Sequence, residues 1–157
     1  MEEKSCCFSG HRQLPQKDLP KIKTCLENEI LRLIHQGVLH FLCGGALGFD
    51  TIAALAVLNC KSKYKRVKLT LALPCKEQEK YWSVPDKIIY AYIKLCADKI
   101  IYTSENYFRG CMHVRNRYLI DSSDYLICYL AKETGGTAYT ASYAKKQGLE
   151  IMNLFNN

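Results

Sequence analysis

No stretch of this 157-residue chain has enough consecutive apolar residues to cross a lipid bilayer as a helix. The opening residues, MEEK, also lack the basic start and apolar core of a secretion signal. We therefore expect a cytoplasmic protein with no membrane partner.

The nine cysteines include no CxxC pair, and they are scattered through apolar segments, as at Cys43, Cys96 and Cys128. Zinc sites and disulfide frameworks need closer and more regular spacing. The pattern predicts reduced thiols that pack as small hydrophobic side chains. We expect no metal site and no bound cofactor.

Two nucleotide-binding signatures are missing as well. The dinucleotide fingerprint needs G-x-G-x-x-G and, about twenty residues later, an acidic residue that holds a ribose hydroxyl. Here the glycine-rich turn reads GGALGFD, and the later segment VKLTL carries no acid. The Walker pattern with its lysine is also absent. These absences disfavour a hydride-transferring dehydrogenase and an ATPase of the Walker type.

The formal net charge is +7, and many of the lysines gather at positions 61–68 and 145–146. Such clusters attract phosphates or nucleic acid. They are also typical of a solvated connector and of the last turn of a helix, where cations suit the dipole. Tyr64 is the one aromatic residue interleaved with these lysines, and this scarcity favours the second interpretation.

Apolar runs of strand length alternate with helical patterns along the whole chain. The expected strands are 5–9, 39–43, 67–73, 99–103, 125–130 and 150–154. The expected helices are 19–36, 50–59, 85–97, 111–122 and 137–147. Most strand runs are continuous, as in strands buried on both faces. The alternation predicts an α/β fold with a Rossmann-like, open, mainly parallel sheet of about six strands, helices on both faces, and a single domain over residues 1–157.

In such sheets, ligands bind beyond the carboxyl ends of the strands, and polar motifs follow several of the predicted strands. After the first strand, Gly10 allows a tight turn, His11 can titrate near neutral pH, and Arg12 can grip a phosphate. A polar loop that opens the first helix explains the same residues. We treat all three as candidate ligand-binding residues.

The glycine-rich turn after the second strand is the stronger signal. Gly44 and Gly45 allow the backbone to approach a ligand, and Gly48 allows the following helix to pack closely. Asp50 is expected either to cap that helix or to lie near a ribose or amine of the ligand.

Later motifs extend the candidate site. Gln78 and Trp82 are four residues apart, so on a helix they would share a face and a base could stack on the tryptophan, although Trp82 could instead cover the core. Arg115 and Asn116 begin a helix that follows the fourth strand, and Arg115 is expected near a phosphate. Arg115 is also the best catalytic candidate.

A second glycine turn follows the fifth strand. Gly135 and Gly136 free the backbone, and Thr137 can cap a helix or bind a phosphate oxygen. We expect the two glycine turns to lie at the same edge of the sheet.

Taken in order, these segments resemble the SLOG superfamily, and most of all its YpsA-like branch of bacterial proteins. The resemblance rests on SGHR, GGALGFD, LPCKEQEKYW, GCMHVRNRYLID and GGTAYTASYA, which cover nearly the whole chain. It implies a Rossmann-like fold with a nucleotide-derived ligand in a glycine-lined cleft.

Two related families imply different activities. The turn at 44–50 is similar to that of the DNA-processing protein that binds single-stranded DNA. The run Met112-His113-x-Arg115 is similar to the arginine motif of Lonely Guy phosphoribohydrolases, which cut nucleoside 5′-monophosphates at the N-glycosidic bond. Those enzymes also use a glutamate after a PGGxGT motif; here Thr134 replaces the proline and residues 139–142 offer no carboxylate. That difference argues against hydrolysis.

We therefore rank three functions. The first is binding of a nucleoside phosphate or ADP-ribose-like ligand by a sensor or regulatory protein. The second is hydrolysis of nucleoside monophosphates, which would need Asp50, Glu77, Glu79 or Asp121 to supply the missing carboxylate. The third is binding of single-stranded nucleic acid. A homodimer is expected to be compatible with the fold, because outer helices of such sheets are free to pair.

Overall fold

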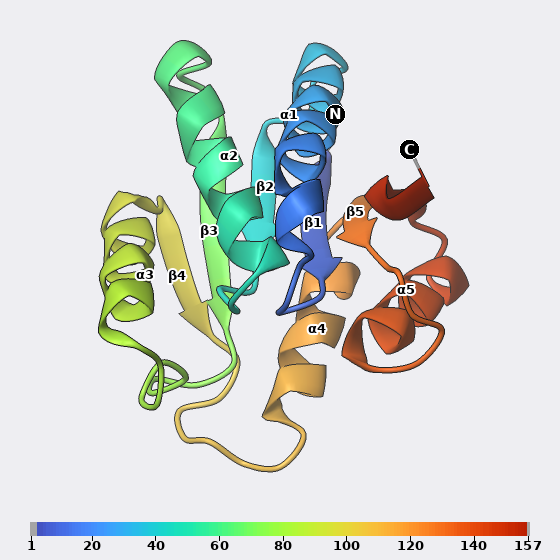
Figure 1. Ribbon diagram of the computed structural model, residues 1–157. Helices are drawn as coiled ribbons and strands as arrows, with labels where there is room; N and C mark the ends of the chain where they lie inside the picture. The colour runs from blue at the N-terminus through green and yellow to red at the C-terminus, as the bar shows by residue number, and fades with distance from the viewer. Residues whose placement is uncertain (1–2, 157) are drawn as a thin grey trace.

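The computed structural model describes residues 3–156, so the expected domain limits at residues 1 and 157 lie outside it. Six strands form one sheet (Figure 1). The strands are β1 (Ser5–Gly10), β2 (His40–Cys43), β3 (Lys68–Leu73), β4 (Lys99–Tyr102), β5 (Tyr125–Tyr129) and β6 (Glu150–Asn153). Every neighbouring pair is parallel, and the order is β4-β3-β2-β1-β5-β6. The predicted Rossmann-like α/β class is confirmed.

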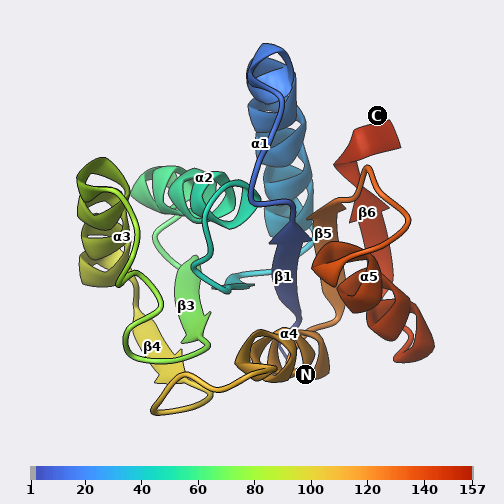
Figure 2. The same cartoon turned by 60° about the horizontal axis from the view of Figure 1, so that its bottom comes forward.

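Five helices cover the two faces of the sheet (Figure 2). One face carries α1 (Leu19–His35), α2 (Phe49–Lys63) and α3 (Val84–Cys96), and the other carries α4 (Cys111–Asp121) and α5 (Gly136–Lys146). Short 3-10 turns at Gln16–Asp18 and Leu154–Asn156 complete the described chain. No described helix is long and apolar enough to span a membrane.

Alternating strand residues build two hydrophobic cores, one on each face of the sheet. In β1, Cys6 and Phe8 join the core under α1, α2 and α3, whereas Cys7 joins the core under α4 and α5. All three side chains are almost fully buried. This explains why the strand sequences are continuously apolar rather than alternating with polar residues.

All nine cysteines are free, and most are buried in these cores, as the spacing predicted. Burial raises the pKa of the Cys7 and Cys128 thiols to about 12. Both are therefore protonated at neutral pH and behave as small apolar side chains.

The strand order places a change of direction between β1 and β5. From β1 the chain proceeds through α1 to β2 on one side, and from β5 it proceeds through α5 to β6 on the other. The loops that leave β1 and β5 therefore diverge and leave a crevice at the carboxyl edge of the sheet. This is the position at which the polar motifs were expected to meet.

Candidate functional site

A cavity of about 480 Å³ opens at this crevice, and we call it the switch-point cavity. Its walls come from β1 and the loop after it, the loop after β2, and the beginnings of α2, α4 and α5. Its lining residues are Phe8, Ser9, Gly10, His11, Arg12, Gln13, Ala46, Asp50, Met112, Arg115, Asn116, Lys132, Gly136 and Thr137. A volume of this size is within the range of small-molecule sites.

Arg115 lies on α4 and is only 4% exposed, which is exceptional for an arginine. Its guanidinium donates to the carbonyl of Gly44 through Nη1 and to Oδ1 of Asn116 through Nε, the latter at 2.8 Å. Burial lowers the pKa of Arg115, and the negative charge of Asp50 opposes that effect. Arginine stays protonated in proteins, so the cavity wall carries a fixed positive charge.

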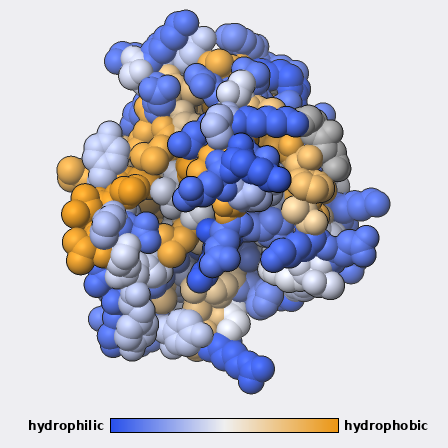
Figure 3. All heavy atoms as spheres, viewed as in Figure 1, coloured by the Kyte–Doolittle hydropathy of each residue, from blue (hydrophilic) through white to orange (hydrophobic). Residues whose placement is uncertain are grey.

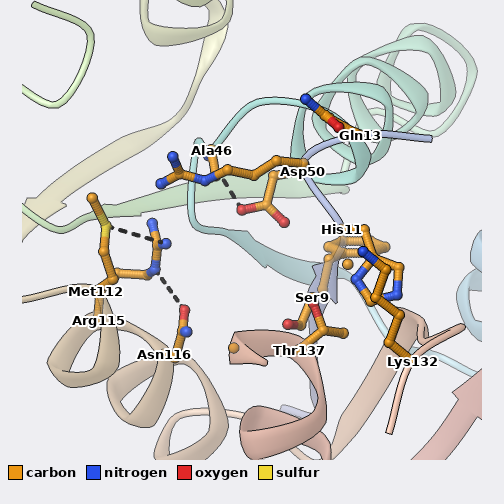
Figure 4. A pocket seen from close by; sticks show the side chains of 14 residues that line it. Ser9, His11, Gln13, Ala46, Asp50, Met112, Arg115, Asn116, Lys132 and Thr137 are labelled. Atoms are coloured by element: carbon orange, nitrogen blue, oxygen red, sulfur yellow. Dashed lines mark hydrogen bonds between the residues drawn. The ribbon is translucent and has the colours of Figure 1, made fainter. Parts of the chain in front are cut away.

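Asp50 faces Arg115 across the cavity, from the first turn of α2 (Figure 4). Of the two roles expected for Asp50, a helix cap or a residue near a ribose or amine of the ligand, the first is wrong. The capping residue is Gly48, and Asp50 Oδ2 accepts the backbone N–H of Ala46 in the preceding loop at 3.2 Å. Burial raises the pKa of Asp50, and the charge of Arg115 partly reverses the rise.

His11 ties the two diverging loops together. Its Nε2 accepts the backbone N–H of Ala131, in the loop after β5, at 2.9 Å. An accepting Nε2 requires a neutral ring with its proton on Nδ1. Burial, reinforced by the charge of Lys132, lowers the pKa of His11. The ring is therefore neutral at physiological pH and acts as a hydrogen-bonding strut.

The electrostatic balance of the cavity favours an anion. Arg12, Arg115 and Lys132 supply three positive charges, and Asp50 supplies the one carboxylate among the lining residues. The N-terminus of α5 adds Gly136 and Thr137, whose backbone N–H groups have no partner within the helix. Cations together with a helix N-terminus form a favourable site for phosphate or carboxylate.

Three glycines of the first turn, Gly44, Gly45 and Gly48, lie behind the cavity wall rather than on it. A Cβ on Gly44 would lie 2.7 Å from Nη1 of Arg115, and one on Gly48 would collide with the carbonyl of Arg12. These glycines thus allow other parts of the protein, rather than a ligand, to come close to the backbone. Gly135 precedes α5 as its capping residue and also lies outside the lining; Thr137 is not the cap.

Gln78 and Trp82 lie apart from the switch-point cavity. Gln78 Nε2 donates to the carbonyl of Gly45 and to the hydroxyl of Tyr90, at 3.2 and 3.0 Å. Trp82 packs edge-on against the same Tyr90, with ring centroids 5.0 Å apart, and covers part of the core under α3. Gln78 lines a neighbouring cavity of about 660 Å³ between the loops after β3 and β4.

Sequence reasoning missed six of the lining residues: Lys132, Ala46, Met112, Phe8, Ser9 and Gln13. Lys132 lies in the loop after β5, three residues past its end at Tyr129, so the rule that ligands bind beyond strand ends could have identified it. Ala46, in the loop after β2, and Met112, in the first turn of α4, carry no polar signal, and only tertiary packing brings them to the cavity. Within residues 3–156, no three His, Cys, Asp or Glu side chains gather as metal ligands would.

An all-parallel α/β sheet with this strand order, and a cationic cavity at its switch point, defines a protein of the Rossmann-like class. A family model described as the YspA SLOG family matches residues 9–153. The chain belongs to this family.

Several bacterial proteins are similar along most of the sequence. The uncharacterised SPbeta prophage-derived protein YoqJ of Bacillus subtilis is 34% identical over 118 residues, which cover 68% of this chain and 69% of YoqJ. The UPF0398 protein BH1768 of Halalkalibacterium halodurans is 33% identical over 129 residues, or 80% of this chain and 68% of that protein. The UPF0398 protein YpsA of B. subtilis is 28% identical over 83% of this chain and 74% of its own.

Two solved structures share the fold. DNA processing protein A from Helicobacter pylori, described with a single-stranded DNA binding mode, superposes with a TM-score of 0.66 at 24% identity over 94% of this chain. DNA processing protein A from Streptococcus pneumoniae superposes with a TM-score of 0.67 at 16% identity over 95% of this chain. This chain spans 63% and 49% of those two chains, so the likeness concerns one part of each.

Proposed function

We propose that this protein binds a nucleotide or nucleotide-derived anion, such as a nucleoside phosphate or an ADP-ribose-like ligand, in the switch-point cavity, and acts as a sensor or regulatory protein. One observation carries the proposal: Arg12, Arg115, Lys132 and the N-terminus of α5 line the same cavity, although they come from four separate segments. Three cations against one buried carboxylate leave that cavity with an excess of positive charge.

In this proposal the phosphate lies between the N-terminus of α5 and the arginines. Backbone N–H groups of Gly136 and Thr137 donate to its oxygens, as at other helix N-termini that bind anions. Arg115 is preorganised, because its guanidinium is already oriented by Gly44 and Asn116. Arg12 and Lys132 are exposed and complete the charge neutralisation from the solvent side.

The proposal is tested by thermal unfolding in the presence of inorganic phosphate, the nucleoside 5′-monophosphates and ADP-ribose. A ligand that binds only the folded state raises the midpoint in proportion to the logarithm of its concentration. We expect at least one nucleotide to give a saturable rise that inorganic phosphate alone does not match. If every compound up to millimolar concentration leaves the midpoint unchanged, the proposal is wrong.

Hydrolysis of the bound nucleotide remains a second candidate, because one of the four carboxylates considered lines the cavity. Asp50 is that residue; Glu77 lines the neighbouring cavity, Glu79 pairs with Lys94, and Asp121 accepts from Tyr143. A buried carboxyl with a raised pKa suits a general acid. Release of free base from a nucleoside monophosphate, lost in Asp50→Asn, would support cleavage; no release from any nucleotide would exclude it.

Single-stranded nucleic acid is a third candidate, favoured by the neighbouring cavity. Tyr81 and Tyr107 line it with 90% and 71% of their surface exposed, and Met112 lines both cavities. Exposed rings next to the cationic switch-point cavity suit stacked bases and a phosphate backbone. Oligonucleotide affinity that falls steeply with salt and with Tyr81→Ala would support this function, whereas binding of mononucleotides alone would exclude it.

A further inference from the structure

The outer face of α3 is apolar although it faces solvent. Val84, Ile88, Tyr92 and Leu95 expose 69%, 64%, 54% and 84% of their surface. At about 100° per residue, these positions fall on one stripe of the helix. A surface helix normally presents charged or polar residues there.

Only the inner face of α3 packs against other parts of the chain. Tyr90 and Ile93 are its buried residues, and they pack into the core against the sheet. Of the charged residues of α3, Lys94 is turned aside toward Glu79, 3.6 Å away. A helix that is apolar on both faces is normally covered on both.

The apolar surface continues onto the edge of the sheet. β4 is the outermost strand and pairs only with β3, and its Ile100 and Tyr102 are each 37% exposed. Figure 3 shows hydrophobic side chains gathered on the side of the molecule where Figure 1 places α3. We call this combined surface of α3 and β4 the edge face.

We propose that the edge face binds a second copy of this chain in a two-fold dimer. Judged from the exposed fractions of its side chains, it offers roughly 700 Å², close to the ~800 Å² that each partner buries in a standard interface and above most apolar patches of monomers. A partner that brings the same area completes an interface of stable size.

Two-fold symmetry makes the stripe complementary to itself. The two α3 helices lie antiparallel, so Val84 and Ile88 of one copy meet Leu95 and Tyr92 of the other, and the two helix dipoles oppose each other favourably. The centre of the stripe carries no charge within the described chain, so two copies of a protein with net charge +7 can approach there. None of these residues lines the switch-point cavity, so the dimer and the ligand site are independent.

The test is the molar mass of the full-length protein, measured by light scattering after gel filtration, with Leu95→Glu and Ile88→Glu as the disrupting variants. Leu95 and Ile88 are exposed, so a charge at either position leaves the monomer folded. Circular dichroism will show this, together with an unfolding midpoint equal to that of the dissociated wild-type monomer. Val114→Glu, at a 43% exposed position on α4, is the matched control.

We expect twice the monomer mass for the wild type and for Val114→Glu, and the monomer mass for Leu95→Glu and Ile88→Glu. A wild type that is monomeric at about 100 µM overturns the proposal. A dimer that survives Leu95→Glu also overturns it, because the contact then lies elsewhere.

Discussion

Arg115 and Gly44 meet across two separate segments of the chain: the guanidinium donates to the Gly44 carbonyl, and Gly44 has no Cβ where the guanidinium lies. The contact joins α4 to the loop after β2, so it fixes the cavity wall and the charge it carries. The first glycine turn thus shapes the switch-point cavity indirectly, through the arginine it accommodates.

Gly44→Ala should therefore destabilise the protein. The added Cβ would lie 2.7 Å from Nη1 of Arg115, and displacing a buried guanidinium is costly. We expect a loss of about 1–3 kcal/mol in urea unfolding, typical of overpacking. Gly136→Ala is the control, because nothing lies within 4 Å of its added Cβ and the residue begins a helix; its stability should be equal or slightly higher. Equal stabilities of the two variants would contradict the argument.

His11 should make the free energy of unfolding depend on pH in the acid range. Because its folded pKa lies below the unfolded value of about 6.5, folding favours the neutral ring. Its contribution is present above pH 6.5 and is lost as the pH falls through the lowered pKa of His11, since protonation removes the acceptor for Ala131 N–H. NMR titration should give His11 a midpoint below 6.5, and His11→Ala should flatten part of the decline in stability. A midpoint at or above 6.5 would show that His11 does not accept the hydrogen bond from Ala131 N–H.

Arg115→Met should destabilise the protein most at neutral pH. Without the guanidinium, the pKa of buried Asp50 rises further, so folding increasingly favours its protonated form. Protonated Asp50 stabilises the folded state at low pH. This stabilisation is lost as the pH rises through the raised pKa of Asp50. We expect a loss of about 3 kcal/mol at pH 7.5 and a smaller one at pH 5, measured by urea unfolding. In an Asp50→Asn background, the loss should no longer vary with pH; an unchanged variation would mean that the two charges are not coupled.

Trp82 offers an optical check, because it is the single tryptophan of the chain. It packs on Tyr90 and is not part of the switch-point cavity. A nucleotide that binds at that cavity should therefore leave tryptophan fluorescence nearly unchanged at saturation. Strong quenching by the same nucleotide would instead favour a base stacked on Trp82.

Much of the fold follows from the pattern of apolar residues. All six strands and five helices occur where they were predicted, mostly within one residue, because strands buried on both faces give unmistakable apolar runs. The second helix is the exception: it continues to Lys63 rather than ending at Asn59. Its last turn ends in the polar residues Lys61, Ser62 and Lys63, although Cys60 is buried and continues the apolar stripe of Ala53 and Val57.

The site was predictable only in part. Gly10, His11, Arg12, Asp50, Arg115, Asn116, Gly136 and Thr137 were selected because they follow strand ends, and the parallel sheet brings all of them to one cavity. The strand order determined which of the other predicted residues reach this cavity. Gln78 follows β3, which lies two strands away from β1, so it lines the neighbouring cavity instead. Hydrogen bonds such as that from Ala131 to His11 join residues 120 positions apart, and no local pattern encodes them.

Titration calorimetry on three forms of the protein tests the central claim most directly, with ADP-ribose and the nucleoside 5′-monophosphates as ligands. Arg12→Ala removes an exposed arginine from the cavity, and Arg117→Ala removes an exposed arginine that instead contacts Tyr139, outside it. We predict that the wild type and Arg117→Ala bind at least one nucleotide with equal affinity, and that Arg12→Ala binds it about tenfold more weakly, as expected for a lost charge-assisted hydrogen bond. Equal affinities for all three forms, or no binding to any, would contradict the account.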